Sequence, residues 1–178
     1  MCSFMEIKKH LKPLLVLGIL LLSVGCTNSE ETGTHADEND SEQNIRSFLN
    51  ELLNGPSEEQ EQLLKGPGSE GDLKEFTEKL GEYKVKHIKP YLSVETNGTF
   101  HFLRIAQEND YELKVEDITL EERESYYKFT VNVSYTHNKR NESKTMNAKG
   151  HAQTNEEGKI TSIQYINFEE FRAALENK

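Results

Sequence analysis

Beyond residue 26 the sequence contains no cysteine, because the only two cysteines of the 178-residue chain are Cys2 and Cys26. The residues after Cys26 therefore cannot form a disulfide, use a thiolate nucleophile or bind zinc through sulfur. A basic patch is also missing: 31 acidic residues outnumber 21 lysines and arginines, and the formal net charge is −10. Because a nucleic-acid-binding surface needs clustered positive charge, we exclude nucleic acid as a partner.

Familiar catalytic signatures are missing as well. The sequence has no Gly-rich phosphate loop, no Gly-x-Ser-x-Gly elbow and no Ser/His/Asp signature. Four histidines of the later part of the chain show neither the i, i+4 spacing nor the acidic sequence neighbours of a zinc site: His87, His101, His137 and His151. We therefore predict no metal and no cofactor, and we favour a non-enzymatic protein.

Apolar residues are scarce, at 34% of the chain, whereas charged residues make up 29%. Average domains contain roughly 45–50% apolar residues when glycine is counted, so much of this chain must be solvated. One domain of ordinary size, residues 44–178, remains once an N-terminal targeting segment and a tether are set aside.

The N-terminal region has the order of an export signal. Lys8, Lys9 and Lys12 precede an eleven-residue apolar run at 14–24. This run is shorter than the ~20 residues that span a bilayer, so cleavage is favoured over an uncleaved signal anchor. Removing residues 1–25 takes away three lysines and Glu6, which changes the net charge from −10 to −12. Met1 and Met5 are both acceptable start residues, since the sequence after Met5 is still basic.

The segment Leu22-Ser-Val-Gly-Cys26 follows directly and resembles the lipobox of bacterial lipoproteins, although leucine stands one place early. The resemblance implies a diacylglyceryl thioether on Cys26, cleavage before it, and anchoring to the outer face of the cell membrane. Residues 26–43 would then be a lipidated cysteine and a disordered acidic tether, because residues 27–43 contain six acidic residues, no lysine or arginine and no large apolar residue. A calcium loop is disfavoured, since the Asp-x-Asp-x-Asp-Gly order is missing.

Apolar spacing then predicts helices. Ile45, Phe48, Leu49, Leu52 and Leu53 form one stripe of a helix beginning near Ser41. A capping box at Ser57 and Gln60 opens a short second helix, which ends at Gly66. Asp72 caps a third helix with Leu73, Phe76, Leu80 and Tyr83 along one side, Val85 continues its spacing, and Pro90 stops it. After a turn at Asn97-Gly98, Phe100 to Ile105 suggests a fourth.

From Tyr111 the pattern alternates, which predicts strands. A phase shift at Glu116-Asp117 suggests a bulge in the first strand. Residues 127–135 give the clearest strand, and residues 145–153 place small residues, Ala148, Gly150 and Ala152, on the inner face, where they leave room for close packing. A fourth strand at 160–166 precedes a short terminal helix opened by Asn167.

The fold class is therefore α+β: N-terminal helices on a curved four-stranded antiparallel sheet, with a short C-terminal helix. This order resembles the nuclear-transport-factor-2-like superfamily. The stretch from Lys89-Pro-Tyr-Leu92 to Gly158-Lys-Ile-Thr-Ser-Ile-Gln-Tyr-Ile166 also resembles small lipoproteins of Bacillus-like bacteria that carry this fold. No motif of that group is tied to a reaction, so the resemblance implies fold and location only.

Two kinds of site remain. In the first, a small molecule would enter the interior of the cone-shaped fold, where Asp117 with Tyr127 or Tyr135 could act as base and donors; the alternation of the tyrosines fits a core strand better. In the second, favoured here, a protein, peptide or cell-envelope component binds a polar face of the middle strands, which lacks an aromatic anchor. We call this surface the polar strand face, and it comprises Lys128, Thr130, Asn132, Asn147, Lys149, His151 and Gln153.

Overall fold

The described part of the chain opens with helix α1 (Glu38–Leu53), which begins three residues before Ser41 and inside the expected tether. The structure is a computed structural model that describes residues 38–68, 72–94 and 100–176. All five apolar residues that predicted α1 are buried. Ser41 is buried too and accepts a hydrogen bond from the hydroxyl of Thr154 at 3.2 Å. Folded structure therefore includes part of the acidic segment.

Helices α2 (Glu58–Leu64) and α3 (Leu73–His87) confirm the next two predicted helices, including the stop before Pro90. Asp72 precedes α3 as expected, but its side chain makes no capping hydrogen bond. The capping box is formed by both of its bonds, between Ser57 and Gln60. The apolar side of α3 differs from expectation, because Leu73 and Val85 are 55% and 57% exposed. The reason is that α3 packs beside α2 rather than on the sheet, so only part of its stripe is covered.

Helix α4 (His101–Glu108) confirms the fourth predicted helix, with Phe102, Leu103 and Ile105 buried. The predicted turn at Asn97-Gly98 lies outside the described residues. None of the described helices is long and apolar enough to cross a membrane. The predicted signal, Cys26 and the tether up to residue 37 also lie outside the described residues.

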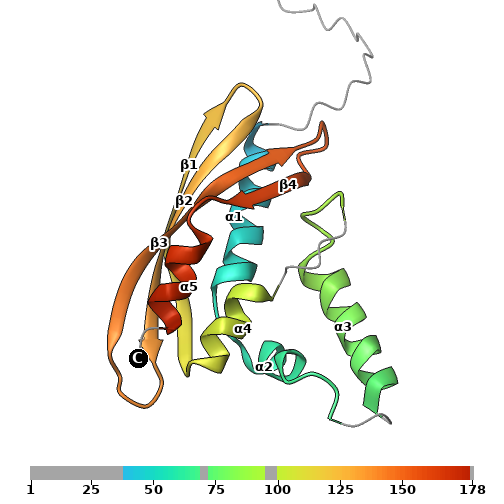
Figure 1. The fold of residues 1–178 in the computed structure, drawn as a ribbon. Coiled ribbons are helices and arrows are strands. Elements are labelled where there is room, and N and C mark those ends of the chain that lie inside the picture. Colours follow the sequence, from blue (N-terminus) through green and yellow to red (C-terminus); the bar gives the residue numbers. More distant parts are fainter. Residues whose placement is uncertain (1–37, 69–71, 95–99, 177–178) are drawn as a thin grey trace, which may run out of the picture. The chain divides into compact units, whose positions relative to one another are not determined.

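The sheet is the predicted antiparallel meander in the order β1-β2-β3-β4 (Figure 1). Its strands are β1 (Tyr111–Arg123), β2 (Tyr126–His137), β3 (Ser143–Thr154) and β4 (Ile160–Tyr165). The predicted bulge is present, since the β1–β2 register shifts between Val115 and Asp117. With the helices, these strands confirm the α+β class.

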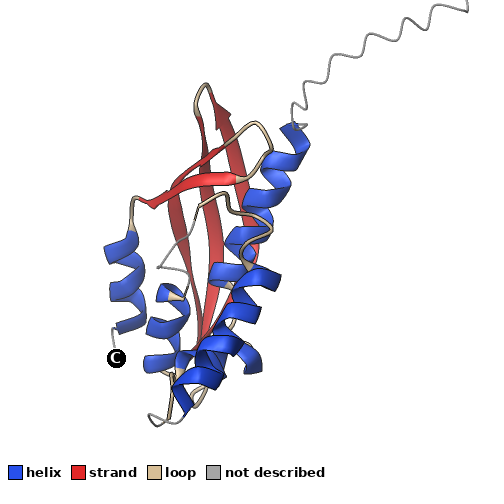
Figure 2. Ribbon diagram, turned by 90° about the vertical axis from the view of Figure 1, so that its right-hand side faces the viewer, coloured by secondary structure: helices blue, strands red, loops and turns tan. Residues whose placement is uncertain are grey.

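The helices α1, α4 and α5 (Phe168–Glu176) lie on one side of the sheet, as Figures 1 and 2 show. Between them the inward side chains of β2 are fully buried, among them Phe129, Val131 and Val133. Burying each such side chain contributes about 1.5–3 kcal/mol, so this layer contributes substantially to the stability of the fold. The other face of the sheet carries the alternate, polar side chains of the same strands.

Gly150 shows what packs close to the small inner residues of β3. A Cβ at this position would lie 2.4 Å from the ring of Phe129 and 2.1 Å from the carbonyl oxygen of Gln164. Real Cβ atoms do not approach so closely, and the contact with a backbone oxygen could not yield easily. The absence of a side chain at Gly150 thus lets β2, β3 and β4 close around one aromatic ring.

Asn167, expected to open α5, uses its side chain to extend the sheet. Its Oδ1 accepts from the Lys149 amide at 2.8 Å, and its Nδ2 donates to the Asn147 carbonyl at 2.7 Å. The amide of Ile166 also donates to the Lys149 carbonyl at 2.9 Å. Asn167 therefore satisfies backbone groups of β3 just beyond the end of β4.

Candidate functional site

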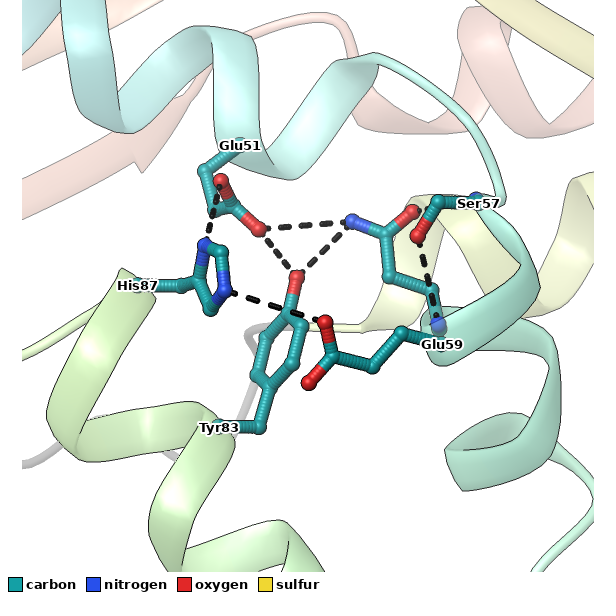
Figure 3. Close-up of polar contacts among 6 residues, drawn as sticks. Glu51, Ser57, Glu59, Tyr83 and His87 are labelled. Carbon is teal, nitrogen blue, oxygen red and sulfur yellow. Dashed lines mark hydrogen bonds and ion pairs between the residues drawn. The ribbon is translucent and has the colours of Figure 1, made fainter.

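A partly buried polar cluster joins three helices at the end of the domain where α2 lies (Figure 3). Glu51 comes from the last turn of α1, Glu59 and Gln60 from the first turn of α2, and Tyr83 and His87 from the end of α3. Because Tyr83 and His87 are four residues apart, they share one face of α3. We call these five residues the polar junction.

Gln60 has a partner for each end of its side-chain amide. Its Oε1 accepts from the Ser57 amide at 2.7 Å, which completes the capping box. Its Nε2 donates to the hydroxyl of Tyr83 at 2.8 Å and lies 3.4 Å from Glu51 Oε1. Only 4% of Gln60 is exposed, and a buried amide of this kind must be satisfied. The residue that caps α2 thereby also fastens α2 to α3.

Gly55 lies against the side-chain carbonyl of Gln60, where its lack of a side chain leaves room for Gln60. The residue has a φ of +129°, and a Cβ there would lie 2.3 Å from Gln60 Oε1. The same glycine is paired with β1, since its amide donates to the Leu113 carbonyl at 2.9 Å and its carbonyl accepts from the Leu113 amide at 2.6 Å. The connection between α1 and α2 is thus pinned to the sheet beside the polar junction.

The hydroxyl of Tyr83 donates to the carboxylate of Glu51 while it accepts from Gln60. Tyr83 is only 2% exposed. Burial, followed by the hydrogen bond to Glu51, raises the pKa of Tyr83 well above its usual value of 10. The phenol therefore remains protonated and serves as a donor to Glu51 over the ordinary pH range.

His87 lies between two carboxylates. Its Nδ1 is 3.5 Å from Glu51 Oε2 and its Nε2 is 3.9 Å from Glu59 Oε2. The imidazole stacks on the ring of Tyr83, with centroids 4.6 Å apart and planes at 23°. The buried Nε2 has no hydrogen-bond partner among the described residues. These acidic neighbours were missed by sequence reasoning, because they come from other helices and give no local pattern.

The polar junction is built to hold helices together rather than to react with a ligand. The Gln60 amide and the Tyr83 hydroxyl are directed at each other and at Glu51, and Figure 3 shows the side chains of Glu51, Tyr83 and His87 meeting between the ribbons. No group of three or more metal-ligating side chains with the geometry of a metal site occurs among the described residues. We therefore assign the polar junction a structural role.

A cavity of about 400 Å³ lies beside the junction, between α2 and α3. Four carboxylates line it, together with the apolar side chains of Leu63 and Phe76. The one cationic side chain of the lining, Lys79, forms an ion pair with Glu75 at 2.7 Å. Acidic side chains on two solvated helices are the ordinary composition of such a surface, so this cavity carries no assignment.

The seven residues predicted as the polar strand face do lie together. In the β2–β3 register Lys128 is opposite His151, Thr130 is opposite Lys149, and Asn132 is opposite Asn147. Gln153 continues the row at the end of β3. All seven are exposed or half-buried, and they alternate with inward residues. Strand pairing therefore brings together side chains that are about twenty residues apart in the sequence.

Charges on the neighbouring strand β1 modify this face. Lys128 is 3.7 Å from Glu121, which also pairs with Arg123. Further along β1, hydrogen bonds from Ser134 and then Lys114 lower the pKa of Glu116. Positive charge on β2 is thus partly balanced by β1, and the middle of the face presents mainly amides and hydroxyls.

An aromatic residue of the face was missed by sequence reasoning. Tyr126 begins β2 two residues before Lys128, and its half-buried ring lies 4.7 Å from the His151 ring, centroid to centroid. The alternation of β2 could have identified it, because residues two apart point to the same side of a strand. The expectation that the face lacks an aromatic anchor is therefore wrong.

The alternative set of Asp117, Tyr127 and Tyr135 is not brought together. Asp117 is exposed and pairs with Asn132, whereas Tyr127 and Tyr135 are buried against the helices. Asp117 and the tyrosines thus lie on opposite faces of the sheet. The bulge between Val115 and Asp117 produces this result, because it shifts the alternation of β1 by one residue.

Comparison with known proteins adds little. No protein-family model matches the sequence, and no curated protein matches it. Among solved structures, the solution NMR structure of protein TraH from the Gram-positive conjugative plasmid pIP501 is similar with a TM-score of 0.39 and 16% sequence identity. That match covers 74% of this chain and 94% of the other. A likeness this weak assigns neither fold family nor function.

Proposed function

We propose that this chain is a lipoprotein anchored to the outer face of the cell membrane through lipid on Cys26, and that its α+β domain is a non-catalytic binding module. The anchor rests on the sequence Leu22-Ser-Val-Gly-Cys26 after a basic segment and an apolar run. The nuclear-transport-factor-2-like assignment is part of the same proposal. It is supported by the order of helices followed by a four-stranded meander.

The polar strand face is the surface that we propose for binding a protein, peptide or cell-envelope component. The observation that carries this proposal is the pairing of its seven side chains across β2 and β3. They present amides, amines, a hydroxyl and an imidazole on the face of β2 and β3 opposite to the buried side chains. Polar side chains with an aromatic neighbour are suited to hydrogen-bonded recognition.

The interior of the fold was the alternative site for a small molecule, and no observation favours it. The inward side chains of β2 are fully buried by α1, α4 and α5. The aromatic rings of Phe102, Phe129 and Tyr165 pack against one another with centroids 4.5 and 5.4 Å apart. A ligand in this position would have to displace core side chains.

The anchor is tested by labelling cells that express the chain with a radioactive fatty acid. We expect label in the membrane fraction, and loss of both label and membrane retention in Cys26→Ala. Cys2→Ala is the matched control, since Cys2 lies before the proposed cleavage position. Label that persists in Cys26→Ala would overturn the anchor.

The binding face is tested by placing a photo-crosslinking amino acid at Asn147 or Lys149 in intact cells. We expect both positions to capture the same identified partner. A crosslinker at Glu78, which is exposed on α3, serves as control and is expected to capture no such partner. Equal capture from Glu78 would contradict a specific role for the polar strand face.

A further inference from the structure

The polar strand face contains a small cavity where β2 begins. Its volume is about 140 Å³, and three strands contribute its lining: Tyr126, His151, Gln153, Ser162 and Gln164. Two of these residues, His151 and Gln153, belong to the face as predicted, and β4 supplies Ser162 and Gln164. The cavity therefore extends the polar strand face across the β3–β4 pair.

Strand pairing arranges these side chains as a regular grid. His151 is directly opposite Gln164, and Gln153 is directly opposite Ser162. Tyr126 precedes the Tyr127–Ala152 pair and so lies beside Gln153. Neighbouring strands are about 4.8 Å apart, and residues two apart in one strand are about 6.6 Å apart. The five side chains therefore lie close together on one face of the sheet.

The lining favours an uncharged ligand rich in hydroxyl groups. No aspartate, glutamate, lysine or arginine lines the cavity, and each of the five side chains contains a group that can donate or accept a hydrogen bond. A sugar hydroxyl can both donate and accept a hydrogen bond. It can therefore pair with either the oxygen or the NH₂ group of the Gln153 and Gln164 amides. A charged ligand would find no opposite charge in the lining and would lose hydration on binding.

Tyr126 supplies the apolar surface that a sugar also requires. Its ring is tilted by 53° against the imidazole of His151, and this contact limits its orientation. An aromatic ring held in this way offers a flat apolar face to the C–H groups of a sugar ring and a hydroxyl at its edge. One amide of the lining is nearly unengaged, since Gln153 Nε2 makes a long 3.5 Å contact to the Ser125 carbonyl.

A peptide fits this cavity less well. Extended peptides usually bind by adding a strand to a sheet edge, or by placing apolar side chains in pockets. The cavity is lined by β2 and β3, which are already paired on both sides, and by Ser162 and Gln164 of the edge strand β4; its lining has no aliphatic side chain. Aliphatic pockets are therefore lacking at this position, and only β4 has an edge to which a peptide strand could be added.

We propose that the cavity formed by Tyr126, His151, Gln153, Ser162 and Gln164 binds one unit of an uncharged glycan chain. The inference rests on the binding function proposed above and names the class of its ligand. Tyr126 stacks on the sugar ring, and the amides of Gln153 and Gln164 hydrogen-bond its hydroxyls. An N-acetylated glycan and an unsubstituted glycan share this chemistry, and the test separates them.

The test is a titration of the full chain in detergent micelles, followed by NMR of the side-chain amides. The probes are tetra-N-acetylchitotetraose and cellotetraose, with trilysine as a charged control. We expect at least one tetrasaccharide, and not trilysine, to shift the Gln153 and Gln164 signals. Whichever tetrasaccharide binds more tightly identifies the source. No shift with either sugar at millimolar concentration would overturn the proposal.

Variants sharpen this test. Tyr126→Ala is expected to weaken binding about tenfold, which is the loss of one aromatic contact. Gln164→Ala tests the amide at an exposed position where folding is not at risk, and it is expected to weaken binding several-fold. Thr145→Ala, at an exposed position of β3 outside both the cavity and the polar strand face, is the matched control and should leave the affinity unchanged. Equal weakening by Thr145→Ala would contradict the assigned position.

The glycan proposal and the broader function fail in different ways. If both sugars leave the amide signals unchanged while crosslinkers at Asn147 and Lys149 still capture an identified protein, the face is a binding surface and the glycan assignment is wrong. If the sugars bind but the crosslinkers capture nothing, the glycan site stands and a protein partner is excluded. Absence of fatty-acid labelling affects the anchor alone.

Discussion

Two contacts between elements of this domain are filled by different kinds of side chain. One is the contact of β2 with the helices that cover it, and the other is the contact of α3 with α1 and α2. At the first, fully buried apolar residues such as Phe129 and Val131 pack against helices. At the second, Glu51, Gln60, Tyr83 and His87 make directional polar contacts, while Leu73 and Val85 of α3 remain exposed. One helix layer is thus held by packing, whereas α3 combines limited apolar packing, through Phe76, Leu80 and Tyr83, with hydrogen bonds.

This difference predicts unequal local stability. Apolar packing contributes in proportion to the area buried, whereas a hydrogen bond contributes only about 0.5–1.5 kcal/mol net. A helix held by few bonds should open at lower free energy than the sheet and α1. The four predictions below test this contrast, beginning with the largest expected effect.

Phe129→Ala should be the most damaging of the substitutions. Phe129 is 0% exposed and its ring fills the space above Gly150, so its removal leaves a cavity among backbone atoms. Large-to-small changes of this kind cost about 3–5 kcal/mol. Urea unfolding of the full chain in detergent measures the loss. Leu73→Ala is the control and should change stability by less than about 0.5 kcal/mol; a comparable loss there would mean that α3 is packed like the core.

Glu51→Ala should cost less and act locally. It leaves the buried hydroxyl of Tyr83 and the amide of Gln60 without their shared acceptor, which costs about 1–3 kcal/mol. Hydrogen exchange should accelerate at the amides of α3 while those of β2 and β3 stay protected. Glu78→Ala removes an exposed carboxylate paired with Lys74 on α3 itself and should cost no more than about 0.5 kcal/mol. Uniform acceleration in the sheet would contradict a local role.

Elements with a strong period could be predicted from the sequence, and those that depend on distant partners could not. The stripe of α1, the alternation of β2 and the bulge after Val115 were all correct, because each is encoded by neighbouring residues. The exposure of Leu73 and Val85 on α3 was not predicted. Their spacing indicates a helix but does not indicate which surface covers it. Whether Leu73 is buried is decided by the position of other elements.

The polar strand face and the polar junction also differ in how far the sequence could predict them. The residues of the polar strand face follow from alternation within β2 and β3, and strand pairing then brings them together. Tyr126 lay one residue outside the predicted strand, and β4 contributes Ser162 and Gln164 only through the β3–β4 register. The polar junction unites residues from three helices, so no spacing in the sequence could have indicated it.

Alkaline pH should lower the free energy of unfolding through the buried hydroxyls of two tyrosines, Tyr83 at the end of α3 and Tyr165 in the aromatic core. Burial and the bond to Glu51 raise the pKa of Tyr83, and burial raises that of Tyr165, above the usual value of 10. The folded state therefore holds these protons more tightly than the unfolded state, so stability is unaffected below pH 10 and falls above it. Each tyrosine contributes about 1.4 kcal/mol per pH unit in that range. Urea midpoints at pH 9 to 11 should fall less steeply in Tyr83→Phe, and an unchanged slope would contradict a raised pKa of Tyr83.

At neutral pH, replacing tyrosine by phenylalanine should change the free energy of unfolding in opposite directions at Tyr83 and Tyr165. The hydroxyl of Tyr165 is buried among aromatic rings and has no hydrogen-bond partner among the described residues, so Tyr165→Phe removes an uncompensated desolvation cost. We expect a gain of about 1 kcal/mol, whereas Tyr83→Phe should lose about 1 kcal/mol because Glu51 and Gln60 lose their common partner. Urea midpoints at constant m-value measure both changes. A loss of stability in both variants would show that the Tyr165 hydroxyl has a hydrogen-bond partner. Tyr83 and Tyr165 would then not differ in the way that the contrast between the core and α3 predicts.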